Sequence, residues 1–321
     1  MGKSLFVKDL KNMESALIFT ENFLVTSKSV LKTNAGKPYL SLTLKDASGE
    51  IDGRVWDNVD LISARFGSND YVSLTGSLVT HQGRHQVKIL DIKKVEAEQI
   101  DPGDFIPSTP KSIDEMWGRI ESLIASIGDK SLKSFLKELF SSSEIAKKVK
   151  TAPAGKVLHH EYIGGLLEHV LSVAEICDFL SKHYPEANRD MLISGALLHD
   201  IGKIYELSYD RAIDYTDEGK LIGHIVIGAE LITKLEEKKK LLGKEKEMLL
   251  KHIILSHHGE LEYGSPKRPK TLEALIVHFV ENLDSKVGAF LSVLEKADGD
   301  EAWSDYQRMF NRFLYVKRDE E

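Results

Sequence analysis

Short runs of alternating apolar and polar residues occupy the first third of the chain. This period of two predicts β-strands that keep one face in a core. In the clearest run, Leu40, Leu42 and Leu44 share one face, and Tyr39 lies on the other. The predicted strands lie near 23–26, 39–44, 51–56, 71–80 and 86–95, with a short helix at about 58–66. Five strands with a helix between the third and fourth are typical of an OB-fold barrel, which we predict for residues 1–95.

Beyond residue 112 the apolar residues recur every three or four positions, which predicts α-helices. Residues 96–112 contain three prolines that disfavour both helix and strand, so a linker is expected there. We expect a multi-domain chain, with connecting helices at 113–159, an all-α helical bundle at 160–298 and a last amphipathic helix in the tail at 299–321. Within the bundle, helices are expected at about 165–183, 190–203, 223–239, 244–258 and 271–296.

Composition narrows the class of protein. The 321 residues are 42% hydrophobic and 29% charged, as in ordinary globular domains. No apolar run is long enough for a membrane span, and no secretory signal is visible, so we expect a cytoplasmic protein with no membrane partner. The single cysteine, Cys177, excludes an internal disulfide and a cysteine-based zinc site.

Charge and histidine are both unevenly distributed. The net charge is −7, and residues 1–100 hold 13 Lys or Arg against 12 Asp or Glu, so the acidic balance belongs to the remainder. An acidic region can bind nucleic acid if basic groups are local or cations are bound. Ten of the 12 histidines lie between His159 and His278, and this clustering is the first indication of function.

Seven His and Asp residues fall on successive predicted helices beside apolar neighbours. Neutral imidazoles and carboxylates bind divalent cations, and a helical bundle can hold a cation between facing helices. So many ligands suit two ions bridged by a carboxylate, about 3.5–4 Å apart. His199 and Asp200 diverge by about 100° around a helix, so they can reach different sides of one metal. The candidate ligands are His169, His199, Asp200, His224, His257, His258 and Asp284.

The order H…HD…H…HH…D, with the local sequences LLEHV, LLHDIGK, LIGH, SHHG and NLDSK, resembles the HD-domain metal-dependent phosphohydrolases over about 160–290. An OB-like barrel before such a domain, at this length, resembles the YhaM-type 3′→5′ exoribonucleases. The resemblance implies a first metal site of His169, His199, Asp200 and Asp284, and a second of His224, His257 and His258 that shares Asp200. Whether His257 or His258 is a direct ligand stays open.

The resemblance also implies the reaction and its requirements. It implies a metal-dependent phosphodiesterase that degrades single-stranded RNA, or alternatively single-stranded DNA, from the 3′ end to nucleoside 5′-monophosphates. Two divalent ions per chain are expected, with Mn²⁺ first and Co, Fe, Mg or Zn as alternatives. Asp200 would bridge the ions. Lys203, three residues later on nearly the same helix face, would stabilise a phosphate oxygen, although a surface lysine is the alternative.

The predicted barrel offers its own nucleic-acid candidates. OB-folds bind oligonucleotides on the face of strands 2 and 3 and through neighbouring loops, using aromatic rings and nearby cations. The alternative for Trp56 is that it packs under the linker. Because the charges of residues 1–100 nearly cancel, we expect this domain to bind nucleic acid with modest, salt-sensitive affinity. The candidates are Tyr39, Arg54 and Trp56 on the strands, and Lys37, Arg84 and His85 in the loops.

Two rival functions remain at this point. One is an HD phosphohydrolase that acts on a free or cyclic nucleotide, with the barrel used for assembly. The other is a non-catalytic nucleic-acid-binding scaffold that keeps its metal for stability. A homo-oligomer is possible through the apolar tail. His159 and His160 could face substrate or be structural.

Overall fold

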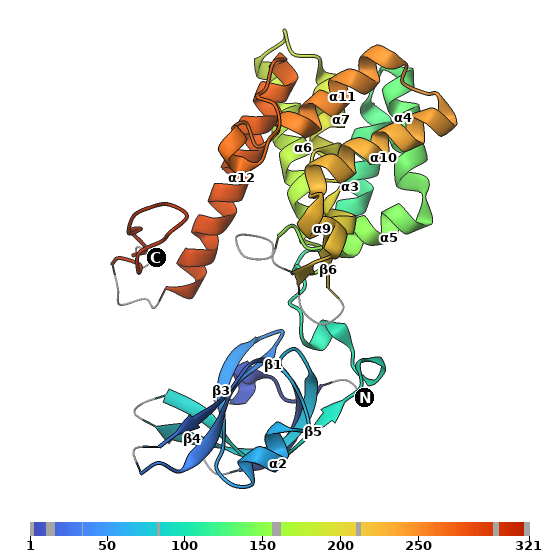
Figure 1. The fold of residues 1–321 in the computed structure, drawn as a ribbon. Coiled ribbons are helices and arrows are strands. Elements are labelled where there is room, and N and C mark those ends of the chain that lie inside the picture. Colours follow the sequence, from blue (N-terminus) through green and yellow to red (C-terminus); the bar gives the residue numbers. More distant parts are fainter. Residues whose placement is uncertain are drawn as a thin grey trace. The chain divides into compact units, whose positions relative to one another are not determined.

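The computed structural model of the chain describes residues 3–10, 17–33, 35–81, 84–155, 162–209, 213–297 and 302–317 (Figure 1). The chain divides into two compact units, Met1–Ser108 with Ser208–Asp214, and Thr109–Leu207 with Tyr215–Glu321. The expected linker at 96–112 contains two short 3₁₀ helices, η1 (Ala97–Gln99) and η2 (Pro102–Asp104).

The first unit is built on a closed five-stranded barrel in the order β1-β2-β3-β5-β4 (Figure 1). β3 and β5 pair in parallel, and the other neighbours pair antiparallel. This architecture confirms the predicted OB-fold. Its elements are α1 (Val7–Leu10), β1 (Ile18–Lys32), β2 (Pro38–Asp46), β3 (Gly49–Val55), α2 (Val59–Ser63), β4 (Tyr71–His81) and β5 (Arg84–Val95).

Buried and more exposed residues alternate along β2 and β3, as the sequence pattern predicts. Leu40, Leu42 and Leu44 of β2 are at most 1% exposed, and Val55 of β3 is buried beside them. Burying each of these side chains contributes roughly 1.5–3 kcal/mol. Tyr39 stays partly exposed on the opposite face, so β2 separates the apolar core from a polar and aromatic surface.

The second unit is a helical bundle in which α6 packs against α3, α5, α7 and α12, and the predicted all-α bundle is confirmed. Short strands β6 (Leu207–Ser208) and β7 (Asp214–Tyr215) pair with each other. The helices are α3 (Ile113–Ser126), α4 (Lys130–Ser141), α5 (Ser143–Thr151), α6 (Gly165–His183), α7 (Arg189–Leu198), α8 (Lys203–Glu206), α9 (Asp217–Leu221), α10 (His224–Lys239), α11 (Lys244–Ser256), η3 (Leu261–Tyr263) and α12 (Leu272–Lys296).

The single helix predicted over 190–203 is wrong. α7 ends at Leu198, and a turn over residues 199–202 separates it from α8. Inside the turn the amide N–H of Lys203 donates to the carbonyl of Asp200, so the bonds span three residues instead of four. An ideal Cβ on Gly202 would lie 2.0 Å from the carbonyl oxygen of His224, so the turn is pressed against the start of α10. This tertiary contact has no signature in the local helical pattern.

The helix predicted in the tail is also wrong for the part that the structure describes, residues 302–317. This segment folds back on itself through isolated β-bridges from Trp303 to Tyr315 and from Gln307 to Arg312. Its rings contact one another across the fold, with the Trp303 and Tyr315 centroids 5.4 Å apart. The aromatic residues of the tail therefore pair across a turn and do not form one face of a helix.

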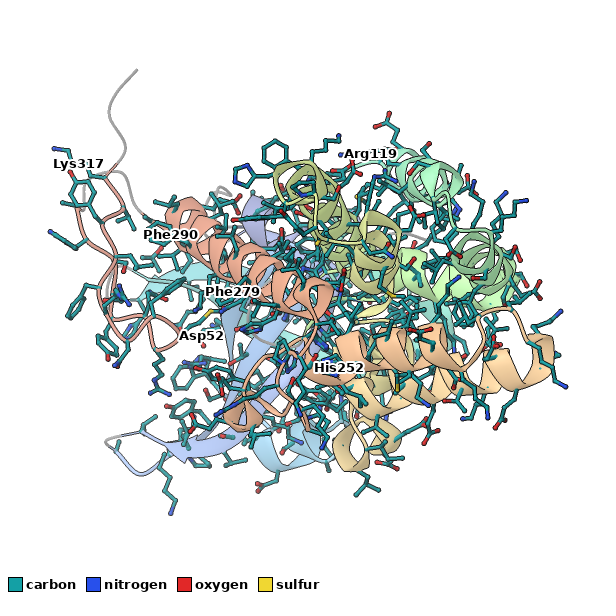
Figure 2. All side chains as sticks on the ribbon, turned by 90° about the horizontal axis from the view of Figure 1, so that it is seen from above. Asp52, Arg119, His252, Phe279, Phe290 and Lys317 are labelled. Atoms are coloured by element: carbon teal, nitrogen blue, oxygen red, sulfur yellow. The ribbon has the colours of Figure 1, made fainter. Side chains whose placement is uncertain are left out.

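α12 has one buried face and one exposed apolar face. Ala274, Val277 and Val280 are buried in the bundle. Phe279, which Figure 2 labels, is 60% exposed. None of the described helices combines the length and apolarity needed to cross a membrane. The exposed large apolar residues of α12 are Leu272, Leu275, Phe279, Leu283, Val287 and Leu291.

Candidate metal centre

The ends of helices in the second unit hold most of the candidate ligands. His199 caps the C-terminal end of α7, and Asp200 follows it in the turn. His224 is the first residue of α10. His257 caps the C-terminal end of α11, followed by His258. A side chain at a helix end can reach across the end of its helix, so several helices can place ligands at one point.

Three of the imidazoles are oriented by backbone carbonyls. A carbonyl oxygen can only accept a hydrogen bond, so each Nδ1 must carry the proton and each Nε2 must present a lone pair. For His199 and His257 the carbonyl belongs to the last turn of the same helix. The Nδ1 to oxygen distances are 2.7 Å from His199 to Ala196, 2.7 Å from His257 to Ile254 and 2.8 Å from His258 to Tyr263.

Carboxylates orient two more imidazoles. Nδ1 of His224 lies 2.9 Å from Oε1 of Glu206, which also accepts the His224 amide N–H. Nδ1 of His169 lies 2.7 Å from Oδ2 of Asp284. The Ser172 hydroxyl donates to the other oxygen of Asp284. Carboxylates behind ligating imidazoles fix the tautomer and raise the basicity of the free nitrogen.

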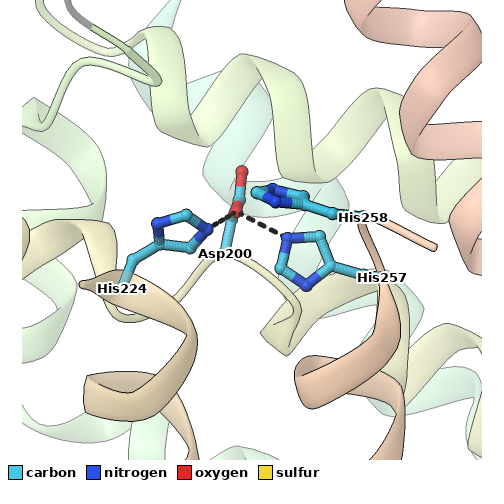
Figure 3. Close-up of side chains that lie close together, drawn as sticks. All are labelled: Asp200, His224, His257 and His258. Atoms are coloured by element: carbon cyan, nitrogen blue, oxygen red, sulfur yellow. Dashed lines mark ion pairs between the residues drawn. The ribbon is translucent and has the colours of Figure 1, made fainter. Parts of the chain in front are cut away.

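The Nε2 atoms oriented in this way converge on Asp200. Nε2 of His224 and of His257 lie 3.5 and 3.4 Å from Oδ1 of Asp200 (Figure 3). On the other side, Nε2 of His169 and of His199 each lie 3.5 Å from Oδ2. The His169 and His199 Nε2 atoms are 3.2 Å apart. Lone pairs therefore face lone pairs around one carboxylate.

Burial makes this arrangement costly without a cation. Oδ1 of Asp200 and the Nε2 atoms of His224 and His257 are buried and, within the described residues, have no hydrogen-bond partner. Leaving such a group unsatisfied costs about 1–3 kcal/mol. Two sets of donors that could hold a metal meet at Asp200. One is Asp200, His224, His257 and His258, and the other is His169, His199 and Asp200.

The protonation states suit metal binding. Burial lowers the pKa of His199 to about 4 and holds the pKa values of His257 and His258 below the usual range. Burial would raise the pKa of Asp200, but the Lys203 ammonium and the nearby imidazoles hold it well below its ordinary value. Neutral imidazoles around an ionised carboxylate are the forms that ligate a divalent cation, so the donor set fits the metal that its residue types predict.

The structure brings together six of the seven predicted ligands. The exception is Asp284, which belongs to neither donor set and whose Oδ2 lies at Nδ1 of His169, on the side of the ring away from Nε2. Lys203 was expected beside a substrate phosphate. Its Nζ lies 2.6 Å from Oδ2 of Asp200, and burial would lower the pKa of Lys203, but Asp200 raises it. A contact between Lys203 and a phosphate stays a prediction.

Tyr39 and Arg54 lie on β2 and β3 as predicted, but Arg84 and His85 belong to β5 and not to a loop, because they pair with His81 and Thr80 of β4. The Tyr39 and Trp56 rings stack with centroids 4.9 Å apart and an interplanar angle of 25°. Arg54 donates to the Gly53 carbonyl at 2.9 Å. Lys37 is exposed, 3.9 Å from the Asp57 carboxylate, and His85 is exposed beside Thr80. His159, His160 and the Arg84 side chain lie outside the described residues.

Two acidic residues near the site escaped the sequence analysis. Glu206 holds His224, and the hydrogen bond from His224 lowers the pKa of Glu206 against the opposing effect of burial. Glu281 is half-buried on α12, and burial followed by the charge of Asp200 raises its pKa to about 7. Glu281 lies three residues before Asp284 and so shares its helix face, which is the one signal that could have found it.

Two family models agree with this fold. A model described as "HD domain" matches residues 166–286, and one described as "OB-fold nucleic acid binding domain" matches residues 24–95. Among solved structures, a replication protein A heterotrimer bound to single-stranded DNA is 17% identical, covering 30% of this chain and 82% of that chain at a TM-score of 0.24.

Curated relatives match nearly the whole chain. A protein named 3′-5′ exoribonuclease YhaM from Geobacillus sp. (strain WCH70) is 36% identical over 291 residues, covering 90% of this chain and 89% of the relative. Proteins of the same name from Oceanobacillus iheyensis and Listeria monocytogenes serotype 4b are 34% and 35% identical, covering 94% and 91% of this chain and 95% and 93% of the relatives.

The fold and the site together define the class of protein. An HD domain with a His and Asp cluster, preceded by an OB-fold, is a metal-dependent HD protein with a nucleic-acid-binding type of fold. With relatives above 30% identity along nearly their full length, the chain belongs to the YhaM family of 3′-5′ exoribonucleases.

Proposed function

We propose that this chain is a divalent-metal-dependent exoribonuclease that hydrolyses single-stranded RNA from its 3′ end to nucleoside 5′-monophosphates. The observation that carries the proposal is the convergence of oriented Nε2 lone pairs on the buried carboxylate of Asp200. Membership of the YhaM family supports the polymer substrate and the polarity.

The chain's own residues prepare the hydrolysis. Divalent cations bound here would lower the pKa of a water molecule and polarise the scissile phosphate. His199 and His257, fixed by carbonyls of their own helices, keep their lone pairs aimed without rearrangement. Asp200 is shared by both donor sets. Attack at phosphorus breaks the bond to the 3′ oxygen of the shortened strand, and the released nucleotide keeps the phosphate on its 5′ oxygen.

Two ions per chain are proposed because the two donor sets share a single carboxylate. Each donor set would hold one cation, and together the two cations would activate water and polarise the phosphate. Both His257 and His258 belong to one set, which supports direct roles for both. Mn²⁺ is the proposed native ion, since imidazole and carboxylate donors accept it, with Co, Fe, Mg and Zn as alternatives.

We propose that Asp284 orients His169 in place of the direct ligation that was expected. Its 2.7 Å bond to Nδ1 holds the Nε2 lone pair of His169 toward Asp200. Loss of such a partner weakens metal binding about 10–100-fold. Isothermal titration of Asp284→Asn with Mn²⁺ should therefore give unchanged stoichiometry and weaker affinity. Loss of one whole ion per chain would show instead that Asp284 is a ligand.

The barrel is proposed to guide the strand to the helical domain. The stacked Tyr39 and Trp56 rings present aromatic surface beside Arg54 and Lys37, and bases stack on such surfaces without sequence preference. Single-stranded DNA is the alternative ligand. A cytoplasmic location and a homo-oligomer stay predictions, the latter supported by the exposed apolar face of α12.

The proposed activity predicts a metal-dependent ladder. Single-stranded RNA labelled at its 5′ end and incubated with Mn²⁺ should shorten stepwise, and a chelator should stop the reaction because the donor sets lose their cations. Gel electrophoresis of time points measures this. Internal fragments would indicate an endonuclease, preferred turnover of free or cyclic nucleotides would favour a nucleotide phosphohydrolase, and binding without hydrolysis would favour a scaffold.

A further inference from the structure

The loop over residues 259–271, between α11 and α12, is hydrogen-bonded directly to His258 of the candidate metal centre. The carbonyl of Tyr263 accepts the Nδ1–H of His258 at 2.8 Å. The His258 amide N–H donates to the hydroxyl oxygen of Ser265, which is 1% exposed, at 3.1 Å. The loop's first bend is equally fixed, because Gly259 has a φ of +80° and a Cβ there would overlap the His278 ring. The loop therefore has a set position beside His258.

The side chains that this loop exposes include an aromatic ring and cations, the types that bind single-stranded nucleic acid. The Tyr263 side chain is 68% exposed although its backbone is held at the site. Lys267, Arg268 and Lys270 follow within seven residues and are all exposed. Arg268 pairs with Glu260 at 2.8 Å, and Glu262 is also exposed, so three cations face two carboxylates.

The charge balance of this loop differs from the acidic balance of the chain beyond residue 100. Beyond residue 100 the chain holds 30 Lys or Arg against 38 Asp or Glu, so a loop with more cations than carboxylates differs from its surroundings. The amide N–H of Lys270 donates to Nε2 of His252 at 2.8 Å, which fixes the backbone of the last cation. An exposed aromatic ring on the same short loop as exposed cations is a combination that can bind a base and its phosphates.

We propose that the 259–271 loop receives the 3′-terminal nucleotides of the RNA strand. The Tyr263 ring stacks on a terminal base, and Lys267 and Lys270 contact the phosphates behind it. This inference rests on the proposed exoribonuclease function and names the residues that hold the end of its substrate. Stacking is tolerant of sequence, as an enzyme that removes every nucleotide in turn requires.

The test compares RNA with a small diester that has no base to stack. Stacking of a single base corresponds to about 5- to 150-fold in affinity. Tyr263→Ala should lower kcat/KM for a 5′-labelled 12-nucleotide RNA by at least about 5-fold more than kcat/KM for bis(p-nitrophenyl) phosphate, and Tyr263→Phe should restore the RNA value. Bound Mn²⁺ should not change, because any residue at 263 keeps the carbonyl that holds His258.

Phe179→Ala is the matched control. Phe179 is also 68% exposed, and it lies ten residues after His169 in α6, about 15 Å along the helix. This variant should degrade RNA as the unaltered chain does. Equal kcat/KM for RNA in Tyr263→Ala and the unaltered chain would overturn the platform while leaving the exoribonuclease intact, as would equal losses on both substrates. Failure of the unaltered chain to shorten RNA would instead remove the proposed function, and the platform with it.

Discussion

Asp200→Asn is expected to abolish RNA hydrolysis, with a loss of more than about 10³-fold in kcat/KM. Asparagine keeps the shape of the side chain but removes the charge that both donor sets share. It also leaves the ammonium of Lys203 buried without its anion. Elemental analysis of the purified protein should find its bound divalent metal lost, because neither donor set keeps its carboxylate.

Asp46→Asn is the matched control for folding. Asp46 is also a fully buried aspartate beside a buried lysine, 3.5 Å from Lys3, but it lies in the barrel. Denaturation of this variant should show reduced stability of the barrel, while its metal content stays that of the unaltered chain. Full metal content and activity in Asp200→Asn would refute the shared-carboxylate centre.

Gly202→Ala is expected to destabilise the helical unit by about 3 kcal/mol or more. The added Cβ would lie 2.0 Å from the His224 carbonyl oxygen and 2.7 Å from the Gly228 nitrogen. Both atoms are backbone, so no side-chain rotation relieves the overlap. Because His224 is displaced, Mn²⁺ binding should weaken together with stability. Urea denaturation and metal titration measure the two effects.

Gly118→Ala provides the comparison, because a Cβ on Gly118 in α3 meets nothing within 4 Å. Alanine there should leave metal binding unchanged and stabilise the helix by about 0.5–1 kcal/mol. If Gly202→Ala matched Gly118→Ala in stability, the turn after α7 would be free to move away from α10.

Much of the fold follows from periodicity. The pattern predicted helices at 165–183 and 271–296, and the structure has α6 and α12 within a residue of these bounds. Periodicity failed where distant segments decide the backbone. The turn at 199–202 depends on the approach of Gly202 to α10, and the tail depends on rings that pair across a fold. Neither contact is visible in a window of sequence.

The residues of the candidate site could be selected from the sequence, but the contacts that orient their side chains could not. The sequence singles out the imidazoles and Asp200 because their residue types and their order along the chain are distinctive, and the structure places their side chains close together. Asp284 was also predicted as a ligand, and its position at Nδ1 of His169 could not be predicted because sequence order does not say which side of an imidazole a carboxylate will occupy. Glu206 was missed because a carboxylate that supports a histidine needs no fixed spacing from it. Orientation of the ligands is a property of the packed structure alone.

The helix termini at the centre give it a polarity that no side chain supplies. His199 and His257 cap the C-terminal ends of α7 and α11, so the partial negative charge of these two helix ends lies where cations would bind. α10 begins at His224, so its N-terminal end adds partial positive charge, which favours phosphate oxygens. Because these partial charges belong to the backbone, the site will still favour cations and phosphate oxygens after a single ligand side chain is replaced.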